Sequence, residues 1–149
     1  MVVMIYSDKR CLEGITPTNS VIGLESALSY YGLCDFADQY IVLINRRGVN
    51  INSRYFKFVS IDTQPSDIVD YPPNNGRLKI TTPEATICEM ILCDRRDDFI
   101  IQSLQNYIIF KENDSYNEDL LIDKSKKYGV YEKLMEYLGY AHEDLDDMC

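Results

Sequence analysis

The stretch TTPEATICEMILCDRRDDFIIQSLQNY, residues 81–107, decides the fold because it contains a strand end, a helix start and a buried helix in succession. A β-like run over residues 78–81 leads into Thr82, whose side chain we expect to accept the first free N–H groups of a helix. Pro83 suits the first helical position. Glu84 complements the positive end of the helix dipole, so a helix should begin here.

The helix predicted over residues 85–93 is apolar almost all round, which is typical of a buried central element. Only Thr86 and Glu89 interrupt it, and their spacing places them on neighbouring positions of one helix face. A buried carboxylate needs a hydrogen-bond partner or a raised pKa. Two interpretations of Glu89 stay open: a catalytic carboxylate, or a structural one that bonds to neighbouring groups or faces solvent.

The residues before this stretch predict one helix and a small, mostly antiparallel sheet. The helix is expected over residues 21–31 and should end at Gly32. The strand expected at residues 40–44 is apolar on both faces, which predicts an interior position in the sheet. Further strands are expected at residues 2–6, 55–61 and 67–71.

From Asp97 onward the pattern predicts three more helices, which complete a C-terminal bundle of about four. The second of them should open at the capping box of Ser115 and Glu118 and end at Gly129. The last should be short, leaving residues 142–149 as a frayed acidic tail. We therefore expect a single α+β domain over residues 1–149. If this domain divides, its two lobes are residues 1–81, which mix strands and a helix, and residues 82–141, which are helical.

The charge of the chain is unevenly distributed. The formal net charge is −9, yet the residues up to Ser60 carry six basic and five acidic side chains, so the remainder carries −10. Such a field repels nucleic acid over most of the molecule and favours a basic partner. No apolar run approaches the ~18 residues of a membrane span, and no secretory signal is recognisable.

The five cysteines are odd in number and include no C-x-x-C pair, which predicts reduced thiols in a cytoplasmic protein without a metal site. No phosphate-binding loop, dinucleotide-binding glycine pattern or metalloprotease motif is present, and His142 is the only histidine. The sequence therefore favours a protein that is not an enzyme and has no cofactor. The alternative is a metal-dependent hydrolase built from the acids Asp62, Asp67, Asp70, Glu84 and Glu89 with Lys79.

A basic set lies on or beside a predicted hairpin and is interleaved with aromatic residues. Its members are Arg46, Arg47, Arg54 and Lys57. A basic β-ribbon of this kind binds phosphates or an acidic partner surface, which would suit a transcriptional regulator or nucleic-acid-binding module. The same charges also protect a sheet edge from aggregation, so both interpretations stay open.

Two motifs resemble the AbiEi-type antitoxin family of bacterial toxin–antitoxin and phage abortive-infection systems. The segment ESALSYYGL at residues 25–33 is similar to the family's S-A-L-x-x-x-G-L helix end, and TPEATICE at residues 82–89 to its P-E-R-T-I-x-D helix opening. Ala85 replaces the usual arginine and Glu89 the usual aspartate. The resemblance covers about residues 20–138. Its motif positions, which it implies are structural, are Ser26, Gly32, Leu33, Pro83, Glu84, Thr86 and Glu89.

The resemblance implies a cytoplasmic antitoxin whose partner is a nucleotidyltransferase-like toxin. The family is generally described as neutralising its toxin without a stable complex, although not uniformly, so direct binding stays open. Many members carry an N-terminal winged helix that binds DNA. The residues before the first predicted helix are too few for one, so we expect the antitoxin domain alone, with weak support for DNA binding.

Overall fold

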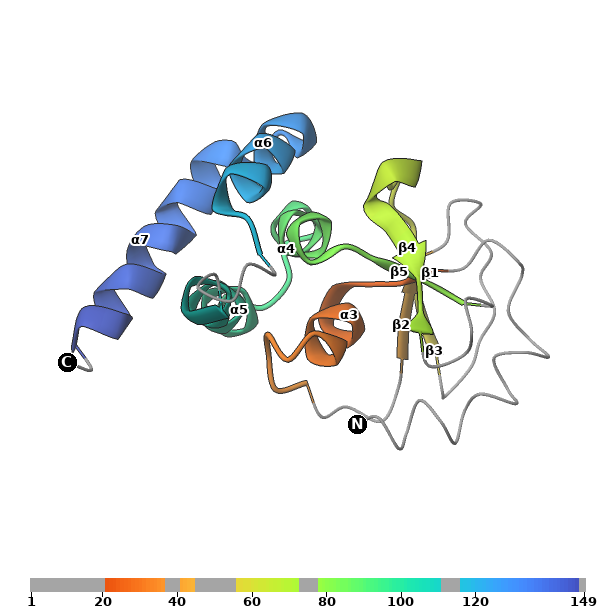
Figure 1. Cartoon of the computed structure of the whole chain (residues 1–149), viewed down its shortest axis with the longest axis horizontal. Coiled ribbons are helices and arrows are strands. Elements are labelled where there is room, and N and C mark those ends of the chain that lie inside the picture. Colours follow the sequence, from red (N-terminus) through yellow and green to blue (C-terminus); the bar gives the residue numbers. More distant parts are fainter. Residues whose placement is uncertain (1–20, 37–40, 45–55, 73–77, 111–115, 148–149) are drawn as a thin grey trace.

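The described strands of the protein form one mixed sheet, and the described α-helices cover one face of it (Figure 1). The computed structural model describes residues 21–36, 41–44, 56–72, 78–110 and 116–147, with side chains up to residue 143. The strands and the 3-10 turn are β1 (Val21–Ile22), β2 (Ile41–Ile44), β3 (Phe56–Val59), η1 (Pro65–Asp67), β4 (Ile68–Asp70) and β5 (Lys79–Thr81). The helices are α3 (Leu24–Tyr30), α4 (Pro83–Leu92), α5 (Asp97–Phe110), α6 (Glu118–Tyr128) and α7 (Tyr131–Asp147).

The described strands are ordered β3-β2-β1-β5-β4. The pairs β1–β2 and β4–β5 are antiparallel, whereas β1–β5 and β2–β3 are parallel. The prediction of a mostly antiparallel sheet is therefore wrong. The predicted hairpin between β2 and β3 is also wrong, because a hairpin joins antiparallel strands and these two run in the same direction.

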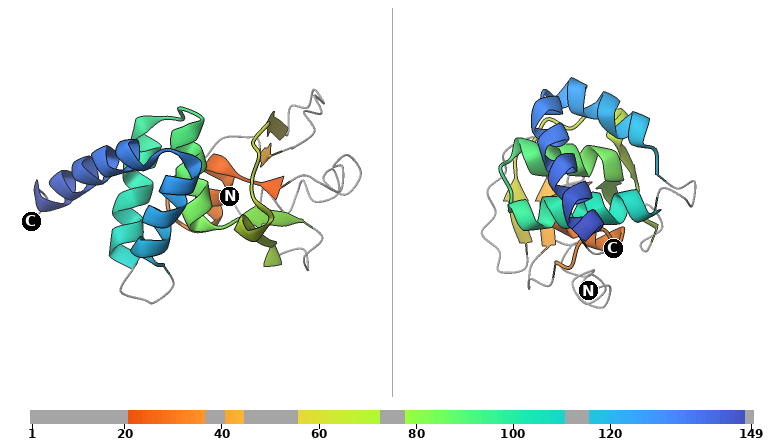
Figure 2. Two further views of the ribbon diagram at one scale, coloured as in Figure 1. Left: turned by 90° about the horizontal axis from the view of Figure 1, so that it is seen from above. Right: turned by 90° about the vertical axis from the view of Figure 1, so that its left-hand side faces the viewer.

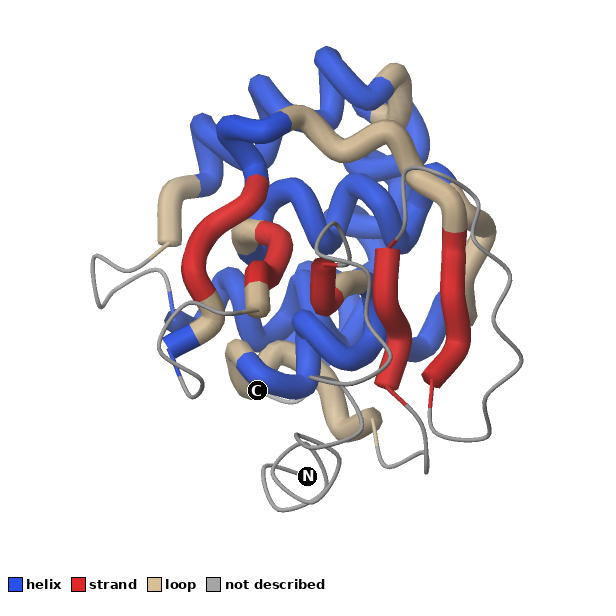
Figure 3. Tube along the Cα trace, turned by 90° about the vertical axis from the view of Figure 1, so that its right-hand side faces the viewer, coloured by secondary structure: helices blue, strands red, loops and turns tan. Residues whose placement is uncertain are grey.

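The helices are arranged in two layers on the sheet. In Figure 1, α3 and α4 lie between the sheet and the outer helices α5, α6 and α7, and Figure 3 places all of them behind the strands. Figure 2 shows α7 as the outermost helix. Strand β2 contributes Val42 and Ile44 to the core beneath the helices and Ile41 and Leu43 to a second buried cluster. Its predicted interior position is confirmed.

The helix predicted over residues 21–31 begins later than expected. Its first two residues are a valine and an isoleucine, whose branched side chains favour the extended chain, and they form β1. Gly23 then brings the backbone close to β2. Its N–H donates to the Val42 carbonyl at 3.1 Å, and a Cβ at this position would lie 2.2 Å from Ile44 Cδ1. Gly32, with φ +74°, follows the end of α3 as predicted.

Helix α4 is the buried central element that the sequence predicts. Every residue from Glu84 to Ile91 is buried, and α4 packs against α3, α5, α6 and α7. Pro83 occupies the first turn as expected. Thr82 is the N-cap residue, but its side chain makes no capping bond, so that expectation is wrong. Its carbonyl instead accepts both the N–H of Thr86 at 2.9 Å and the hydroxyl of Thr86 at 2.6 Å.

Helix α6 begins at a different cap from the predicted one. The Asn117 side chain accepts the Leu120 N–H at 3.2 Å, so Asn117 is the N-cap residue, whereas Ser115 of the expected capping box lies outside the described residues. Asparagine offers the same short acceptor as serine, so the cap shifts along the chain without changing its chemistry. Gly129 ends α6 with φ +73°, as predicted.

The last helix is longer than the sequence predicts. Helix α7 continues to Asp147, so residues 142–147 are helical and the expectation of a short helix with a frayed tail is wrong. Leu134, Leu138 and Ala141 form a buried stripe at helical spacing, which packs α7 onto the other helices up to the predicted end. The α+β class is confirmed, and four helices follow β5 among the described residues. Within the described residues, no helix combines the length and apolarity needed to cross a bilayer.

Candidate functional site

Glu89 lies fully buried on α4, where it meets two hydroxyl groups. Its Oε2 accepts the hydroxyl of Thr63 at 2.5 Å and lies 3.0 Å from the hydroxyl of Tyr128 on α6. Its Oε1 is buried and has no hydrogen-bond partner among the described residues. Burial raises the pKa of Glu89, and the negative charge of Asp67 adds to this, whereas the bonds from Thr63 and Tyr128 act in the opposite direction.

Asp67, at the end of η1, is the second buried carboxylate of this region. It is 1 % exposed, and its Oδ2 lies 3.2 Å from the same Tyr128 hydroxyl. Its Oδ1 forms an ion pair with Lys124 of α6, whose side chain is 13 % exposed. The backbone carbonyl of Asp67 accepts the N–H of Thr82 at 2.8 Å, which fixes η1 against the start of α4. We call Thr63, Asp67, Glu89, Lys124 and Tyr128 the α4–α6 junction.

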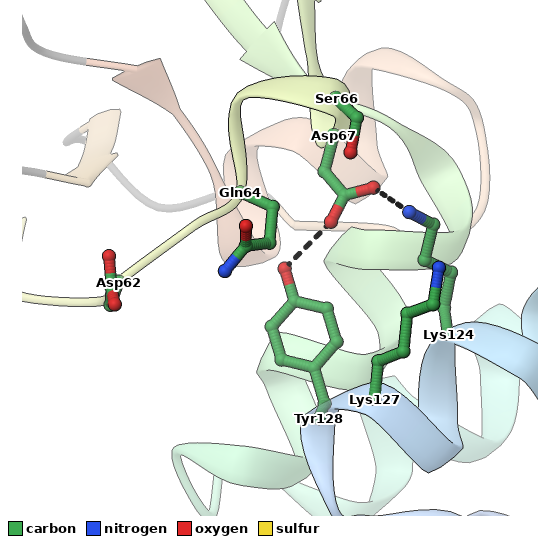
Figure 4. Close-up of a pocket in the computed structure, with 7 residues that line it drawn as sticks. All are labelled: Asp62, Gln64, Ser66, Asp67, Lys124, Lys127 and Tyr128. Atoms are coloured by element: carbon green, nitrogen blue, oxygen red, sulfur yellow. Dashed lines mark hydrogen bonds and ion pairs between the residues drawn. The ribbon is translucent and has the colours of Figure 1, made fainter.

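The junction borders a cleft of about 330 Å³. Figure 4 shows Lys124 and Tyr128 reaching Asp67 from α6, with Lys127 on the same side of the helix. The lining residues are Asp62, Gln64, Ser66, Asp67, Lys124, Lys127 and Tyr128. The size matches a small-molecule pocket. Two lysines are balanced by two aspartates, however, so the lining favours no particular ligand charge.

Glu84 occupies a separate buried position on the first turn of α4. It is 7 % exposed, and it accepts the hydroxyl of Tyr107 on α5 at 3.1 Å. Burial raises the pKa of Glu84 even though the Tyr107 bond acts against this. The same proximity, together with burial, raises the pKa of Tyr107. Glu84 thus joins α4 to α5, away from the junction with α6.

The acids named for the alternative hydrolase do not form one site. Asp67 and Glu89 meet at the junction, while Glu84 faces α5. Asp70 forms an ion pair with Lys79 across the β4–β5 pair. Among the described residues there is no group of three or more histidine, cysteine or acidic side chains placed to hold a metal ion.

The first motif of the resemblance, residues 25–33, forms hydrogen bonds with other parts of the fold. Both carboxylate oxygens of Glu25 accept from Arg95, at 2.5 Å for Nε and 3.0 Å for Nη2, and Glu25 is 3 % exposed. The hydroxyl of Ser26 accepts the N–H of Val42 at 2.8 Å. The carbonyl of Leu33 accepts the side-chain amide of Asn106 on α5 at 2.8 Å.

The second motif is likewise used for internal contacts. The hydroxyl of Thr86 lies 2.6 Å from that of Thr81, at the end of β5. Thr81 also accepts, through its carbonyl, the hydroxyl of Tyr31 at 2.8 Å. These bonds join the end of the sheet to the start of α4 and the end of α3. The motif positions therefore lie at the contacts between α3, α4 and the sheet.

Three residues of the predicted basic set, Arg46, Arg47 and Arg54, lie outside the described residues. Lys57 is exposed on β3, which is the last strand at one end of the described sheet. An exposed lysine on such a strand fits edge protection and phosphate binding equally well. The role of this set stays a prediction.

Within the part of the chain that the structure describes, no thiol forms a hydrogen bond with His142. Cys34 and Cys88 are buried, and burial raises the pKa of each to about 12. Cys93 is half-buried, and burial raises its pKa as well. His142 is exposed on the outer helix α7.

Sequence reasoning finds Glu89 but misses its partners. Thr63 belongs to a connection without regular structure, and nothing in its neighbourhood marks it. The spacing of Lys124 and Tyr128 is the one usable signal, because residues four apart share a helix face. Arg95 is missed because its partner Glu25 lies on a distant segment.

No protein-family model matches the chain, and no curated protein matches it either.

Proposed function

We propose that the protein is an antitoxin-like, non-enzymatic protein that neutralises a nucleotidyltransferase-type toxin of a bacterial toxin–antitoxin or phage-defence system. The proposal starts from the resemblance of residues 25–33 and 82–89 to AbiEi-type antitoxins. The observation that supports it best is that these two distant motifs meet inside the fold: α3 packs on α4, and Glu25 pairs with Arg95 just beyond α4. Buried residues at these contacts maintain the fold, so we place the contact with the toxin on another surface.

The surface that we propose for this contact is the outer row of α7. Glu132, Glu136, Tyr140 and Glu143 are exposed and follow one another at helical spacing. They lie opposite the buried stripe of the same helix, and α7 is the outermost helix in Figure 2. Tyr140 is 47 % exposed, and aromatic residues are enriched in the cores of protein interfaces.

The chemistry of the partner follows from this row. An enzyme that transfers nucleotides needs basic side chains to hold phosphate groups. The acidic side chains of the row are complementary in charge to such a basic groove. The ring of the exposed tyrosine supplies an apolar contact. Binding there would exclude the substrate of the toxin.

The proposal is tested by co-expression with a nucleotidyltransferase-type reading frame adjacent to the gene. We expect the partner alone to arrest growth and this protein to restore it. Glu132→Gln together with Glu136→Gln should weaken the rescue, and capture of the toxin by the tagged wild-type protein should fall steeply as salt rises. Growth arrest that persists with the wild-type protein present would refute the proposal.

A matched double variant distinguishes a specific effect of the α7 row from an effect of the altered net charge. Asp119 and Asp123 are exposed on α6 at the same spacing as Glu132 and Glu136. Replacing both with asparagine changes the net charge by the same amount. We expect this control to rescue growth like the wild type; equal loss in both double variants would place the contact elsewhere.

The alternative functions have less support. Three of the four basic residues of the nucleic-acid alternative lie outside the described residues, and the acids of the hydrolase alternative are dispersed over the fold. Neither has an observation on the described residues that favours it.

A further inference from the structure

The α4–α6 junction has more oxygen–oxygen contacts than its hydroxyl groups have protons. Glu89 Oε2 lies 2.5 Å from the Thr63 hydroxyl and 3.0 Å from the Tyr128 hydroxyl, and Tyr128 lies 3.2 Å from Asp67 Oδ2. A well-formed hydrogen bond at each of the three contacts needs a proton of its own. Thr63 and Tyr128 supply one each. A third proton on one of the carboxyl groups would complete the set, whereas without it Tyr128 has to share its single proton between Glu89 and Asp67.

Asp67 is the poorer candidate for this proton because it has a cationic partner. The ammonium group of Lys124 forms an ion pair with its Oδ1, so a negative charge on Asp67 is compensated within the junction. Glu89 has no cationic partner among the described residues, and its Oε1 is buried without a hydrogen bond. A carboxylate would leave half of its charge on that oxygen, in a place where desolvation is costly.

We infer that Glu89 is a buried proton-binding site, held as the neutral acid at neutral pH, whose proton is donated to Tyr128 while Tyr128 donates to Asp67. This series of hydrogen bonds runs from Glu89 through Tyr128 to Asp67 and ends at the Asp67–Lys124 ion pair, beside the cleft. Tyr128 and Asp67 line the cleft, so they connect the buried proton to solvent. This inference does not depend on the proposed toxin.

Other charged groups do not change the assignment. The groups that act electrostatically on the same region, besides those of the junction, are Glu84 and Cys88 on α4 and Cys93 directly after it. From α3, the charge of Glu25 is matched by Arg95. From α5, Tyr107 faces Glu84 rather than Glu89. No cation among the described residues reaches Glu89, which leaves the neutral form favoured.

The bound proton makes folding depend on pH in a defined direction. An unfolded glutamate releases its proton at about pH 4.3, whereas the folded site retains it to higher pH. Above the ordinary value, the folded state thus binds one proton more than the unfolded state. The contribution of Glu89 to stability is therefore complete below that pH and declines as pH rises. While the folded state still holds the proton, the unfolding equilibrium constant increases about tenfold per pH unit.

Glu89→Gln tests the inference because glutamine is the nearest neutral analogue. Its amide can donate two hydrogen bonds, one to Thr63 and one to Tyr128, and it cannot ionise. The unfolding equilibrium constant, measured by urea titration from about pH 5 to about pH 7, should rise with pH in the wild type relative to the variant. The control Glu132→Gln, an exposed glutamate of α7, should follow the wild type at every pH.

A constant ratio between wild type and Glu89→Gln across that range would overturn the inference, because a carboxylate ionised in both states gives no proton difference. Infrared spectroscopy provides a readout that does not need the glutamine variant to fold. Protein labelled with ¹³C in the glutamate carboxyl groups should show a protonated carboxyl band at neutral pH. The band should persist in Glu84→Gln and shift in Tyr128→Phe, which removes the acceptor; its absence from the wild type would overturn the inference.

Discussion

At the scale of single residues, Gly23 stands out among the described glycines because it has no room for a side chain. A Cβ added there would lie 2.2 Å from Ile44 Cδ1 and 2.7 Å from Ile44 Cγ1, and Ile44 is buried in the core. Overpacking of a core usually destabilises, because neighbouring side chains must leave their preferred rotamers. We expect Gly23→Ala to lower the free energy of unfolding by about 1–3 kcal/mol in urea titration.

A second glycine is the control for this variant. Gly139 lies within α7, and an added Cβ meets no atom within 4 Å. Alanine is the better helix former, so Gly139→Ala should raise the free energy of unfolding by about 0.5–1 kcal/mol. Destabilisation by both variants would mean that the effect at Gly23 is not the contact with Ile44.

At the scale of elements, the bidentate pair of Arg95 and Glu25 joins α3 to the turn after α4. Removing the arginine leaves a nearly buried carboxylate without its partner. Breaking a buried pair in this way costs about 3–5 kcal/mol in other proteins. Arg95 itself is 29 % exposed, so we expect Arg95→Ala to cost about 3 kcal/mol, at the lower end.

The neighbouring arginine is the matched control. Arg96 forms an ion pair with Asp98 in which both side chains are largely exposed, and such pairs contribute little to stability. The Arg96 guanidinium also lies 4.4 Å from the ring centre of Phe99, so Arg96→Ala should lower the urea midpoint slightly, and by much less than Arg95→Ala does. Equal midpoints for both alanine variants would show that the Glu25 pair does not stabilise the fold.

Elements whose ends are set by local chemistry are the ones that the sequence predicts well. Pro83 and Gly129 act within one helix turn, and both occupy their predicted places. Strand direction is not local, since β1 pairs with β5 across the intervening chain, and the sheet is mixed instead of mostly antiparallel. The junction is intermediate. The sequence identifies Glu89 as an unusual buried acid, but Tyr128 reaches it only through tertiary packing.

At the scale of the whole molecule, burial separates the described thiols by reactivity. The thiolate is the reactive form, and a pKa of about 12 leaves almost none of it at neutral pH in Cys34 and Cys88. Cys93 is half-buried and more accessible. Among these three thiols, we expect iodoacetamide to modify Cys93 first in the native protein, with Cys34 and Cys88 reacting only on global unfolding.

Peptide mapping by mass spectrometry measures the modification of each cysteine separately. The same reaction in concentrated urea serves as the reference, where all three thiols should react at similar rates. Native modification of Cys88 as fast as Cys93 would show that α4 opens without unfolding of the whole molecule.

The strand order also determines when the sheet can be completed during synthesis. Strand β1 lies between β2 and β5, and its partner β5 is the last of the described strands to leave the ribosome. The centre of the sheet therefore stays open on one side until translation has passed Thr81, and α4 emerges directly after it. A nascent chain paused before this point exposes the edge of β1 to pairing with other chains. Synthesis of the stretch that completes β5 and starts α4 closes that edge.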